Sequence, residues 1–314
     1  MKRNRGNVRK IAVRAAVLAV LLGVGGGCGV LYKRACPKWQ AAELNPEIRE
    51  TKASPYCDPA GMTQETRLIP PAGYERIPAA EGSFLAFMRE QPLYPDGAAI
   101  CSYTGAQLSD GAAAAAVYTL SVGQEGYQEC ADSIIRLWSE YFMQTGQTER
   151  IAFGLTNGYQ TDYESWRDGK RVIVLGNMTW SMKLAGYDDS EQQLHNYLVT
   201  VMRYAGTRSL EAESETIPVS EAHAGDLLVK GGSPGHAVLI VDEAVNAAGE
   251  RCFLLAQGAM PAQNCHIPAG SGGNENPWYT EEQLVSGKIS FCGYTFQSDA
   301  LCRWKEGFPN AQAE

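Results

Sequence analysis

No part of the chain restricts the fold more than two neighbouring apolar segments near its C-terminal end. Residues 236–242 read HAVLIVD and residues 251–257 read RCFLLAQ. Both rows of alternating side chains in each segment are mostly apolar, which is typical of a strand that is buried on both faces. The short polar stretch between the segments favours an antiparallel hairpin. The sequence therefore predicts a sheet that other elements cover on each side.

One register of this hairpin gives each polar residue at its ends a partner. Asp242 then faces Arg251 as an ion pair, and His236 faces Gln257 on the same face of the sheet. The pairs between them are apolar, namely Ile240 with Phe253 and Val238 with Leu255. A buried imidazole is costly without a hydrogen bond, and the Gln257 oxygen supplies a partner that fixes which ring nitrogen stays free. A purely structural His–Gln pair at the end of a hairpin explains the same pattern.

The rest of residues 67–304 predicts a mixture of helices and strands. Apolar residues at three- and four-residue spacing indicate helices over 129–143, 188–206 and 280–287. The second and third begin with capping boxes, Ser190 with Gln193 and Thr280 with Gln283. Further strands are expected at 117–122, 170–176 and 225–230. Helices that precede a strand-rich half indicate an α+β domain with a central helix packed on an antiparallel sheet.

The N-terminus predicts a membrane anchor. Residues 1–14 carry six basic and no acidic residues, and the 18 residues over 15–32 are uncharged and apolar. A basic flank before such a stretch is typical of a transmembrane anchor or a signal segment whose basic end stays in the cytoplasm. Cys28 follows three glycines and leaves lipidation open as an alternative. In each case the rest of the chain is expected outside the cytoplasm.

The remaining sequence divides into a stalk, a domain and a tail. Residues 33–66 are polar, contain prolines and lack periodicity, so they are expected to form a stalk. Residues 67–304 are long enough for a single domain with its own core, and 305–314 form a flexible tail. Of the 27 basic residues, eight lie within residues 1–34, which leaves 19 against 35 acidic residues and a net charge of −16. A body this acidic argues against binding to nucleic acid or to an anionic lipid surface.

Nine cysteines are many for a chain of 314 residues. No two of them have the Cys-x-x-Cys spacing of zinc or thioredoxin sites, so no metal and no cofactor is expected. In an oxidising compartment, Cys252 with Cys265 and Cys292 with Cys302 are candidate disulfides, between which the spacing does not decide. An odd total leaves at least one thiol for another role.

Cys130 is the best candidate for a reactive thiol because it stands at the start of the helix over 129–143. The positive end of the helix macrodipole favours the thiolate, whereas the adjacent Glu129 opposes it, and a buried structural cysteine is the alternative. A cysteine at a helix start, a histidine at a strand start and a polar residue on the next strand follow one another in this order in papain-like hydrolases. Cys130 would attack, His236 would move the proton, and Gln257 would orient His236. This pairing predicts a lowered pKa of the thiol.

Other polar and aromatic residues are candidates for binding an oxyanion or a substrate. Gln128 and Gln124 precede the cysteine and carry amides able to donate to an oxyanion. His266 is a candidate second polar group near the site. His195 and His223 are expected in solvent. Aromatic residues in loops marked by glycine or proline could line a groove or serve as packing lids: Trp166, Trp278 and Tyr279.

Two resemblances extend this interpretation. The stretch AGDLLVKGGSPGHAVLIVD is similar to the Gly-Asp strand, turn and His strand of the NlpC/P60-type papain-like peptidases. The region from Arg67 to Trp304 also resembles the bacterial family called domain of unknown function 4846, through QECADSIIRLWSEY, WRDGKR, YAGTRSL, GGSPGHAVLIVDEA, LLAQGAMPAQNCH and NPWY. Two positions depart from the family pattern, Glu129 where glutamine is expected and Gly258 where serine is expected. The family name implies no activity, so only the papain-like pattern implies one.

Together these features predict a membrane-anchored, extracytoplasmic thiol hydrolase of the amidase or peptidase type, with a papain-like (NlpC/P60-like) domain. The expected partner is an amide substrate, with cell-wall peptide as the class that the resemblance implies. The alternative is a non-catalytic envelope module of the same shape that binds a ligand or a partner. A metal site formed by the polar cluster is the weakest of the three hypotheses.

Overall fold

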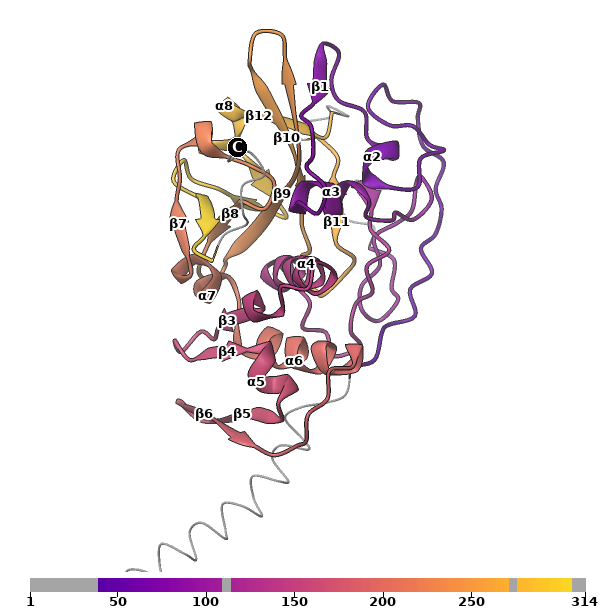
Figure 1. Cartoon of the computed structure of the whole chain (residues 1–314). Helices are drawn as coiled ribbons and strands as arrows, with labels where there is room; N and C mark the ends of the chain where they lie inside the picture. The colour runs from indigo at the N-terminus through magenta and orange to yellow at the C-terminus, as the bar shows by residue number, and fades with distance from the viewer. Residues whose placement is uncertain (1–38, 109–113, 271–275, 307–314) are drawn as a thin grey trace, which may run out of the picture.

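The central feature of the fold is a seven-stranded sheet in which every pair of neighbours is antiparallel. The computed structural model describes residues 39–108, 114–270 and 276–306. The strands follow the order β12 (Trp278–Thr280), β10 (Arg251–Ala256), β9 (His236–Asn246), β8 (Leu227–Lys230), β15 (Leu301–Trp304) and β7 (Ser214–Thr216). The seventh strand, β1 (Tyr74–Arg76), pairs with the far end of β9. β9 is therefore the strand around which the domain is organised (Figure 1).

Both faces of this sheet are buried, as the apolar pattern predicts. On β9, Leu239 and Val241 belong to a large core that also contains the apolar side of α4 (Cys130–Gln144). Val238 and Ile240 belong to a second core, which α8 (Glu281–Leu284) and the segment over 289–296 cover. A strand buried on both faces has no row of side chains in water, which explains why neither row is polar.

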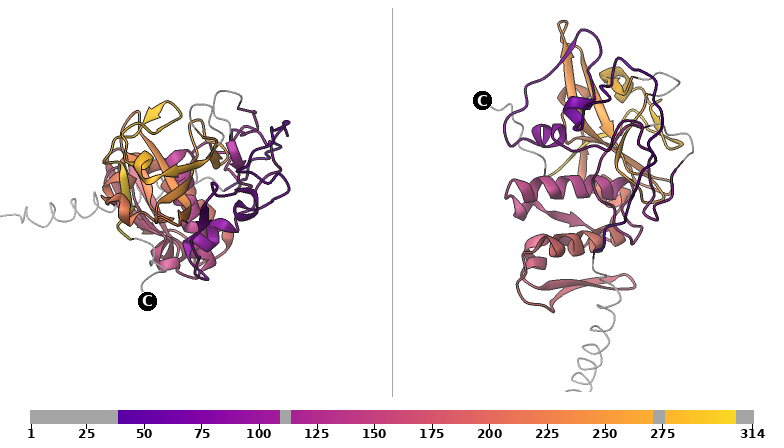
Figure 2. Two further views of the ribbon diagram at one scale, coloured as in Figure 1. Left: turned by 90° about the horizontal axis from the view of Figure 1, so that it is seen from above. Right: turned by 90° about the vertical axis from the view of Figure 1, so that its right-hand side faces the viewer.

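The two longest helices of the described chain lie on one side of the sheet. α4 packs against β9 and lies between the sheet and α6 (Glu191–Tyr204) (Figures 1 and 2). Beyond α6 come α5 (Tyr163–Arg167) and the hairpin of β5 (Lys170–Leu175) and β6 (Met178–Lys183). The predicted α+β class, with antiparallel sheets, is confirmed, as are the helices expected over 129–143 and within 188–206.

The remaining elements are short. The helices are α2 (Gln64–Arg67), α3 (Phe84–Arg89), α7 (Thr207–Ala212) and the 3-10 turns η1 (Thr148–Arg150) and η2 (Val219–Glu221). Two-stranded sheets join β2 (Ala114–Val117) with β11 (His266–Pro268), β3 (Ala152–Gly154) with β4 (Gln160–Asp162), and β13 (Ser290–Phe291) with β14 (Tyr294–Thr295). The strand expected at 117–122 is thus displaced, because the alanine-rich residues before it pair with β11. Thr280 accepts from the Gln283 N–H as the capping box predicts, whereas the Ser190 side chain caps nothing.

The hairpin of β9 and β10 is antiparallel as predicted, but its register differs from the predicted one. Asp242 lies opposite Leu254, and Arg251 lies opposite Val245. β9 continues past Asp242 to Asn246, and the pairing shifts by one residue between Leu254 and Leu255, where β9 has the extra residue Val241. The extension forms because residues 244–246 also pair with β1, a partner far away in the sequence.

The predicted ion pair between Asp242 and Arg251 is therefore absent. The Asp242 carboxylate, which is fully buried, lies 2.7 Å from Nε of Arg76 and 2.9 Å from the Arg89 guanidinium. Both arginines come from the segment over 74–89, which no pattern in the sequence links to β9. The ion pairs of Arg76 and Arg89 with Asp242 hold this segment against the extended end of β9.

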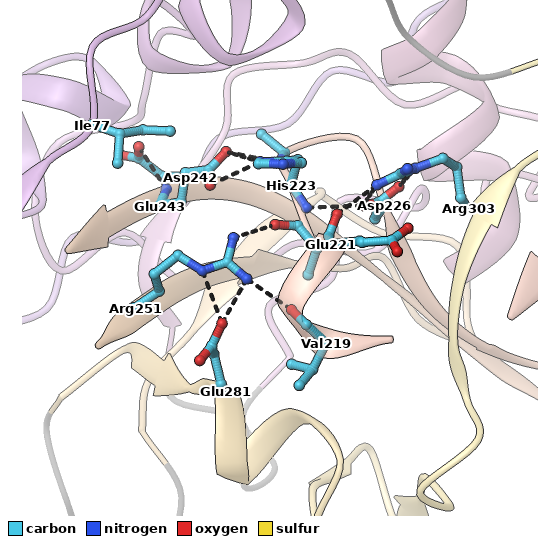
Figure 3. A network of polar contacts seen from close by, with 12 residues as sticks. Ile77, Val219, Glu221, His223, Asp226, Asp242, Glu243, Arg251, Glu281 and Arg303 are labelled. Atoms are coloured by element: carbon cyan, nitrogen blue, oxygen red, sulfur yellow. Dashed lines mark hydrogen bonds and ion pairs between the residues drawn. The ribbon is translucent and has the colours of Figure 1, made fainter. Parts of the chain in front are cut away.

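Arg251 has a different role, which Figure 3 shows. Its guanidinium lies 2.5 Å from the Glu281 carboxylate at the start of α8 and donates to the Val219 carbonyl at 2.8 Å. The same view shows His223, which the sequence places in solvent, half-buried with Nδ1 3.2 Å from the Glu243 carboxylate. These contacts hold the segment before β8 and the start of α8 against the outer end of the sheet.

The described chain begins at Trp39, inside the segment predicted to be a stalk. Trp39 is buried, its ring lies 4.8 Å from the ring of His195, and its N–H donates to Asn196 on α6. From this point the segment packs on the domain instead of standing apart from it. His195, expected in solvent, is itself buried at this contact, where its Nε2 lies 3.2 Å from the Arg136 guanidinium.

Several predicted segments lie outside the residues that the structure describes. The basic segment 1–14 and the anchor over 15–32 lie outside the described residues, as do residues 307–314 of the tail. Within the described part of the chain, no helix has both the length and the apolar character needed to cross a membrane.

Candidate active site

Cys130 and His236 line the same cavity. Its volume is about 740 Å³, within the range typical of small-molecule sites. Cys130 is the first residue of α4 and His236 is the first residue of β9, so the cavity lies where these two elements begin. Other walls come from the loop before α4, from α7, and from the turns around β9 and β13, with Tyr127, Arg208, Ser233, Cys292 and Tyr294 among the lining residues. The fold thereby brings together a thiol and an imidazole from distant parts of the chain.

The sulfur of Cys130 lies among backbone N–H groups. Those of Ala131 and Ala237 hydrogen-bond to the thiol, and Ala237 directly follows His236 in the chain. The N–H groups in the first turn of a helix have no intrahelical acceptor, so the start of α4 favours negative charge. The Asp132 carboxylate accepts from the Glu129 N–H at 3.2 Å and helps to begin the helix at Cys130.

Three buried side chains form a polar chain next to the cavity. Nε2 of His236 lies 2.7 Å from Oε1 of Gln257, and Nε2 of Gln257 lies 3.2 Å from Nε2 of His266. His266 Nδ1 lies 3.1 Å from the Asn264 carbonyl oxygen. Gln257 and His266 also exchange two backbone hydrogen bonds of 2.9 Å, which fixes their side chains beside each other. The prediction that His236 and Gln257 lie on the same side of an antiparallel hairpin is confirmed.

Gly258 explains how the end of β10 comes so close to α4. A Cβ atom at this position would lie 2.2 Å from Ser133 Oγ and 2.7 Å from the Glu129 carbonyl oxygen. The absence of a side chain therefore allows the residue after Gln257 to contact the first turn of α4. A serine at this position would meet both of these contacts.

Burial controls the protonation of the site. Burial, followed by the Asp132 carboxylate, raises the pKa of the Cys130 thiol to about 11, although two N–H groups oppose the change. Burial also lowers the pKa of His236, against the effect of its hydrogen bond to Gln257, and lowers the pKa of His266 to about 4. Near neutral pH the thiol and both imidazoles are uncharged. The lowered thiol pKa expected at a helix start is therefore wrong, because desolvation outweighs the macrodipole.

Neither glutamine proposed for the oxyanion reaches the cavity. Gln128 is 1% exposed, and its amide has no hydrogen-bond partner among the described residues, but the cavity is lined by Tyr127 and Glu129 on either side of it. Gln124 is exposed and donates to the Ala41 carbonyl at 3.1 Å, where the N-terminal segment packs. The backbone N–H groups of Ala131 and Ala237, in contrast, do reach the thiol.

The three aromatic candidates have structural roles. Trp166, Trp278 and Tyr279 are each at most 3% exposed, and none of them lines the cavity formed by the described residues. The Trp166 indole donates to Gln193 at 3.0 Å, and the Trp278 indole donates to the Ile69 carbonyl at 2.9 Å. The glycines and prolines around them suggest loops, but α5 and β12 place these rings in the interior.

Sequence reasoning does not identify Cys292 as a site residue. It occupies the turn between β13 and β14 with φ of 50°, and the next residue, Gly293, has φ of 77°. Two positive φ angles are typical of a type I′ turn, for which Asn-Gly is the preferred sequence. The Cys292 sulfur lies in the cavity wall, 3.5 Å from Nε2 of Gln257. A Cys-Gly pair between two short alternating segments could have indicated the turn but not this contact.

The cysteines of the described residues are all free. The candidate disulfides Cys252–Cys265 and Cys292–Cys302 are therefore not formed. Cys252 and Cys265 are buried in the large core, while Cys292 faces the cavity and Cys302 lies on β15 beside Thr216. In this same part of the chain, no three His, Cys, Asp or Glu side chains gather as metal ligands.

The fold and the site define a class of protein, an α+β domain in which a thiol at a helix start and a histidine at a strand start share one cavity. A family model described as domain of unknown function (4846) matches residues 64–303. The chain belongs to this family, as its sequence segments predict. No curated protein and no solved structure is detectably similar to it.

Proposed function

We propose that this protein is a thiol hydrolase of the amidase or peptidase type, with a papain-like, NlpC/P60-like arrangement of its central helix and sheet. Cys130 is the nucleophile, His236 is the general base and acid, and Gln257 orients His236. One observation carries the proposal: His236 shares a cavity with Cys130 and is held through Nε2 by Gln257 at 2.7 Å. The other ring nitrogen, Nδ1, is then left for proton transfer.

The first half of the reaction acylates the enzyme. His236 Nδ1 accepts the thiol proton while the sulfur attacks the carbonyl carbon of an amide, which gives a tetrahedral oxyanion. The N–H groups at the start of α4 are donors suited to this oxyanion. The imidazolium then gives its proton to the amide nitrogen, the C–N bond breaks, and a thioester on Cys130 remains.

The second half restores the enzyme. His236 removes a proton from a water molecule, the resulting hydroxide attacks the thioester carbonyl, and the C–S bond breaks. The sulfur regains the proton from the imidazolium, and the product is a carboxylic acid. No metal or cofactor takes part in either half of this proposal.

The proposed place of action is outside the cytoplasm, with residues 15–32 as the anchor. The proposed substrate is an amide in the cell envelope, with cell-wall peptide as the leading class, and nucleic acid is not a proposed partner. Fractionation tests the location: recovery of the full-length protein in the soluble cytoplasmic fraction would overturn it.

Acyl transfer tests the activity on the full chain. With p-nitrophenyl acetate we expect nitrophenolate release and an acetyl adduct on Cys130, found by mass spectrometry of peptides. Cys130→Ser and His236→Ala should both lose the adduct. Cys252→Ser is the control, because Cys252 is also a free cysteine but is buried outside the cavity. Acetylation that spares Cys130, or that persists in His236→Ala, would contradict the proposal.

The second candidate is a non-catalytic envelope module that binds a ligand or partner in the same cavity. The observation that favours it is the pKa of Cys130, which burial and the Asp132 carboxylate raise to about 11. A thiol with this pKa is a poor nucleophile unless His236 removes its proton during attack. Absence of any acyl adduct on Cys130, together with protection of Cys130 by cell-wall peptides against alkylation at high pH, would support this module.

A further inference from the structure

We propose that His266 is a positioning residue: through Gln257 it determines which nitrogen of His236 carries the proton and which acts as the base. The catalytic meaning of this assignment rests on the proposed function, but the assignment itself concerns the resting protein. It follows from the donors and acceptors along the polar chain, taken one hydrogen bond at a time.

The contact with the Asn264 carbonyl determines the tautomer of His266. A carbonyl oxygen only accepts, so His266 Nδ1, at 3.1 Å from it, carries a proton and donates. His266 is fully buried, and the pKa of its ring is about 4, so the ring is neutral near pH 7. A neutral imidazole has one protonated nitrogen, which makes His266 Nε2 an acceptor.

The His266 tautomer determines the orientation of the Gln257 side-chain amide. Because His266 Nε2 is an acceptor, the group 3.2 Å from it must be the amide nitrogen of Gln257 and not its oxygen. The Cys292 sulfur lies 3.5 Å from the same amide nitrogen and can accept a hydrogen bond from it in this orientation. In the opposite orientation, the Gln257 oxygen would face the lone pair of His266, and neither group could donate.

The orientation of Gln257 determines where the neutral His236 ring carries its proton. The Gln257 oxygen, now facing His236, accepts only, so His236 Nε2 at 2.7 Å must carry the proton. The neutral His236 ring therefore has its lone pair on Nδ1. This is the nitrogen free to take a proton from Cys130, and its availability depends on a ring that does not itself line the cavity.

Burial makes this arrangement strict. Gln257 is 1% exposed and His236 is 4% exposed, so water does not readily replace a lost partner. A mismatch at any point leaves a buried donor or acceptor unsatisfied, and such a group destabilises the arrangement that contains it. The Asn264 carbonyl belongs to the backbone and cannot change from acceptor to donor. It therefore sets the donor–acceptor direction of every hydrogen bond in the polar chain from His266 to His236.

Nuclear magnetic resonance of the full chain with ¹⁵N-labelled histidines tests the assignment directly. Long-range ¹H–¹⁵N correlations distinguish the two neutral tautomers, and the His236→Ala variant identifies the His236 signals. In the wild type at neutral pH we expect His236 protonated at Nε2 and His266 protonated at Nδ1. A wild-type His236 protonated at Nδ1 would overturn the proposal, whatever the variants do.

The His266→Phe variant removes the acceptor while it keeps a buried ring. We expect Gln257 to lose its fixed orientation, His236 to populate both tautomers, and acetylation of Cys130 to fall by about three- to tenfold, the range that one ordinary hydrogen bond sets. The control is Cys265→Ala, a buried neighbour in the same segment whose side chain is outside the polar chain. It should change stability and leave the His236 tautomer unchanged. Persistence of pure Nε2–H in His266→Phe would contradict the role of His266.

The outcomes separate the two proposals. If wild-type His236 has the expected tautomer but Cys130 is never acetylated, the proposed hydrolase fails and the positioning by His266 stands. If Cys130 is acetylated and His236 has the opposite tautomer, Cys130 remains the nucleophile, but the positioning by His266 and the assignment of Nδ1 as the base both fail.

Discussion

The charge state of the resting Cys130–His236 pair is the most direct consequence of the site's burial. The pKa of the Cys130 thiol is about 11, and that of His236 lies below its ordinary 6.5. These values differ by at least about 4.5, so moving the proton from sulfur to imidazole costs about 6 kcal/mol before the new charges interact. Two unit charges about 4 Å apart attract by about 4 kcal/mol at the effective dielectric constant of about 20 that suits protein sites. The neutral pair is therefore favoured by about 2 kcal/mol.

This reasoning predicts slow alkylation. Raising the thiol pKa from 9.0 to about 11 lowers the thiolate population at pH 7 about a hundredfold, and iodoacetamide should react more slowly by about that factor than with an ordinary thiol. The rate should rise with pH and continue to rise beyond the range of an ordinary thiol. His236→Ala should change it by less than about threefold, because no imidazolium stabilises the resting thiolate.

The measurement is the second-order rate constant for labelling of Cys130 as a function of pH, with Cys130→Ser as the control for the labelled site. The same His236→Ala variant should lose acetylation by p-nitrophenyl acetate, since attack on a carbonyl requires His236 as the base. Fast alkylation that forms a plateau in acid and disappears in His236→Ala would reveal a preformed thiolate–imidazolium pair. That result would refute the neutral resting state.

Three further predictions concern stability, each measured as the free energy of unfolding in urea. Asp242→Asn should destabilise the protein by about 3–5 kcal/mol, because it leaves Arg76 and the buried Arg89 without their carboxylate; a loss below about 1 kcal/mol would contradict the importance of this cluster. Gly258→Ser should cost about 1–3 kcal/mol, because its Cβ would lie 2.2 Å from Ser133 Oγ, while Gly186→Ser, with open space around the Cβ, should be nearly neutral; equal effects would argue against the close approach. Cys292→Asn should stabilise by up to about 1 kcal/mol, because asparagine suits the positive φ of the type I′ turn better than cysteine, and a lower stability would show that the thiol contact outweighs the backbone preference.

The fold was predictable where the side-chain pattern is periodic over many residues. The stripe of α4 and the two apolar strands gave the central helix and the hairpin in nearly the right places. The register was not predictable, because strands that are apolar on both faces fit one another equally well after a shift. The charge pair that seemed to fix it misleads, since Asp242 finds its cations in the segment over 74–89 through contacts between distant residues.

The site was predictable only in part. The sequential order of Cys130, His236 and Gln257 predicts that they lie together, and a hairpin constrains where Gln257 lies relative to His236. The link from Gln257 to His266 depends on a bridge after β10, and the position of Cys292 depends on a turn that returns to the cavity. The prediction that the aromatic candidates line a groove was wrong, because loop-like composition says little about which rings the tertiary fold buries.

The uncharged resting site has a consequence for selectivity. A pre-ionised thiolate would react with any electrophile that enters the cavity, whereas a thiol with a pKa of about 11 becomes nucleophilic only when its proton leaves during attack. In the proposed reaction, that proton transfer creates an imidazolium and an oxyanion together, and the start of α4 would stabilise only a ligand whose carbonyl lies beside its N–H groups. A correctly placed amide would thus supply the site of negative charge that the Cys130–His236 pair lacks at rest. Burial, which opposes the reaction in the empty cavity, would then confine it to ligands that fit.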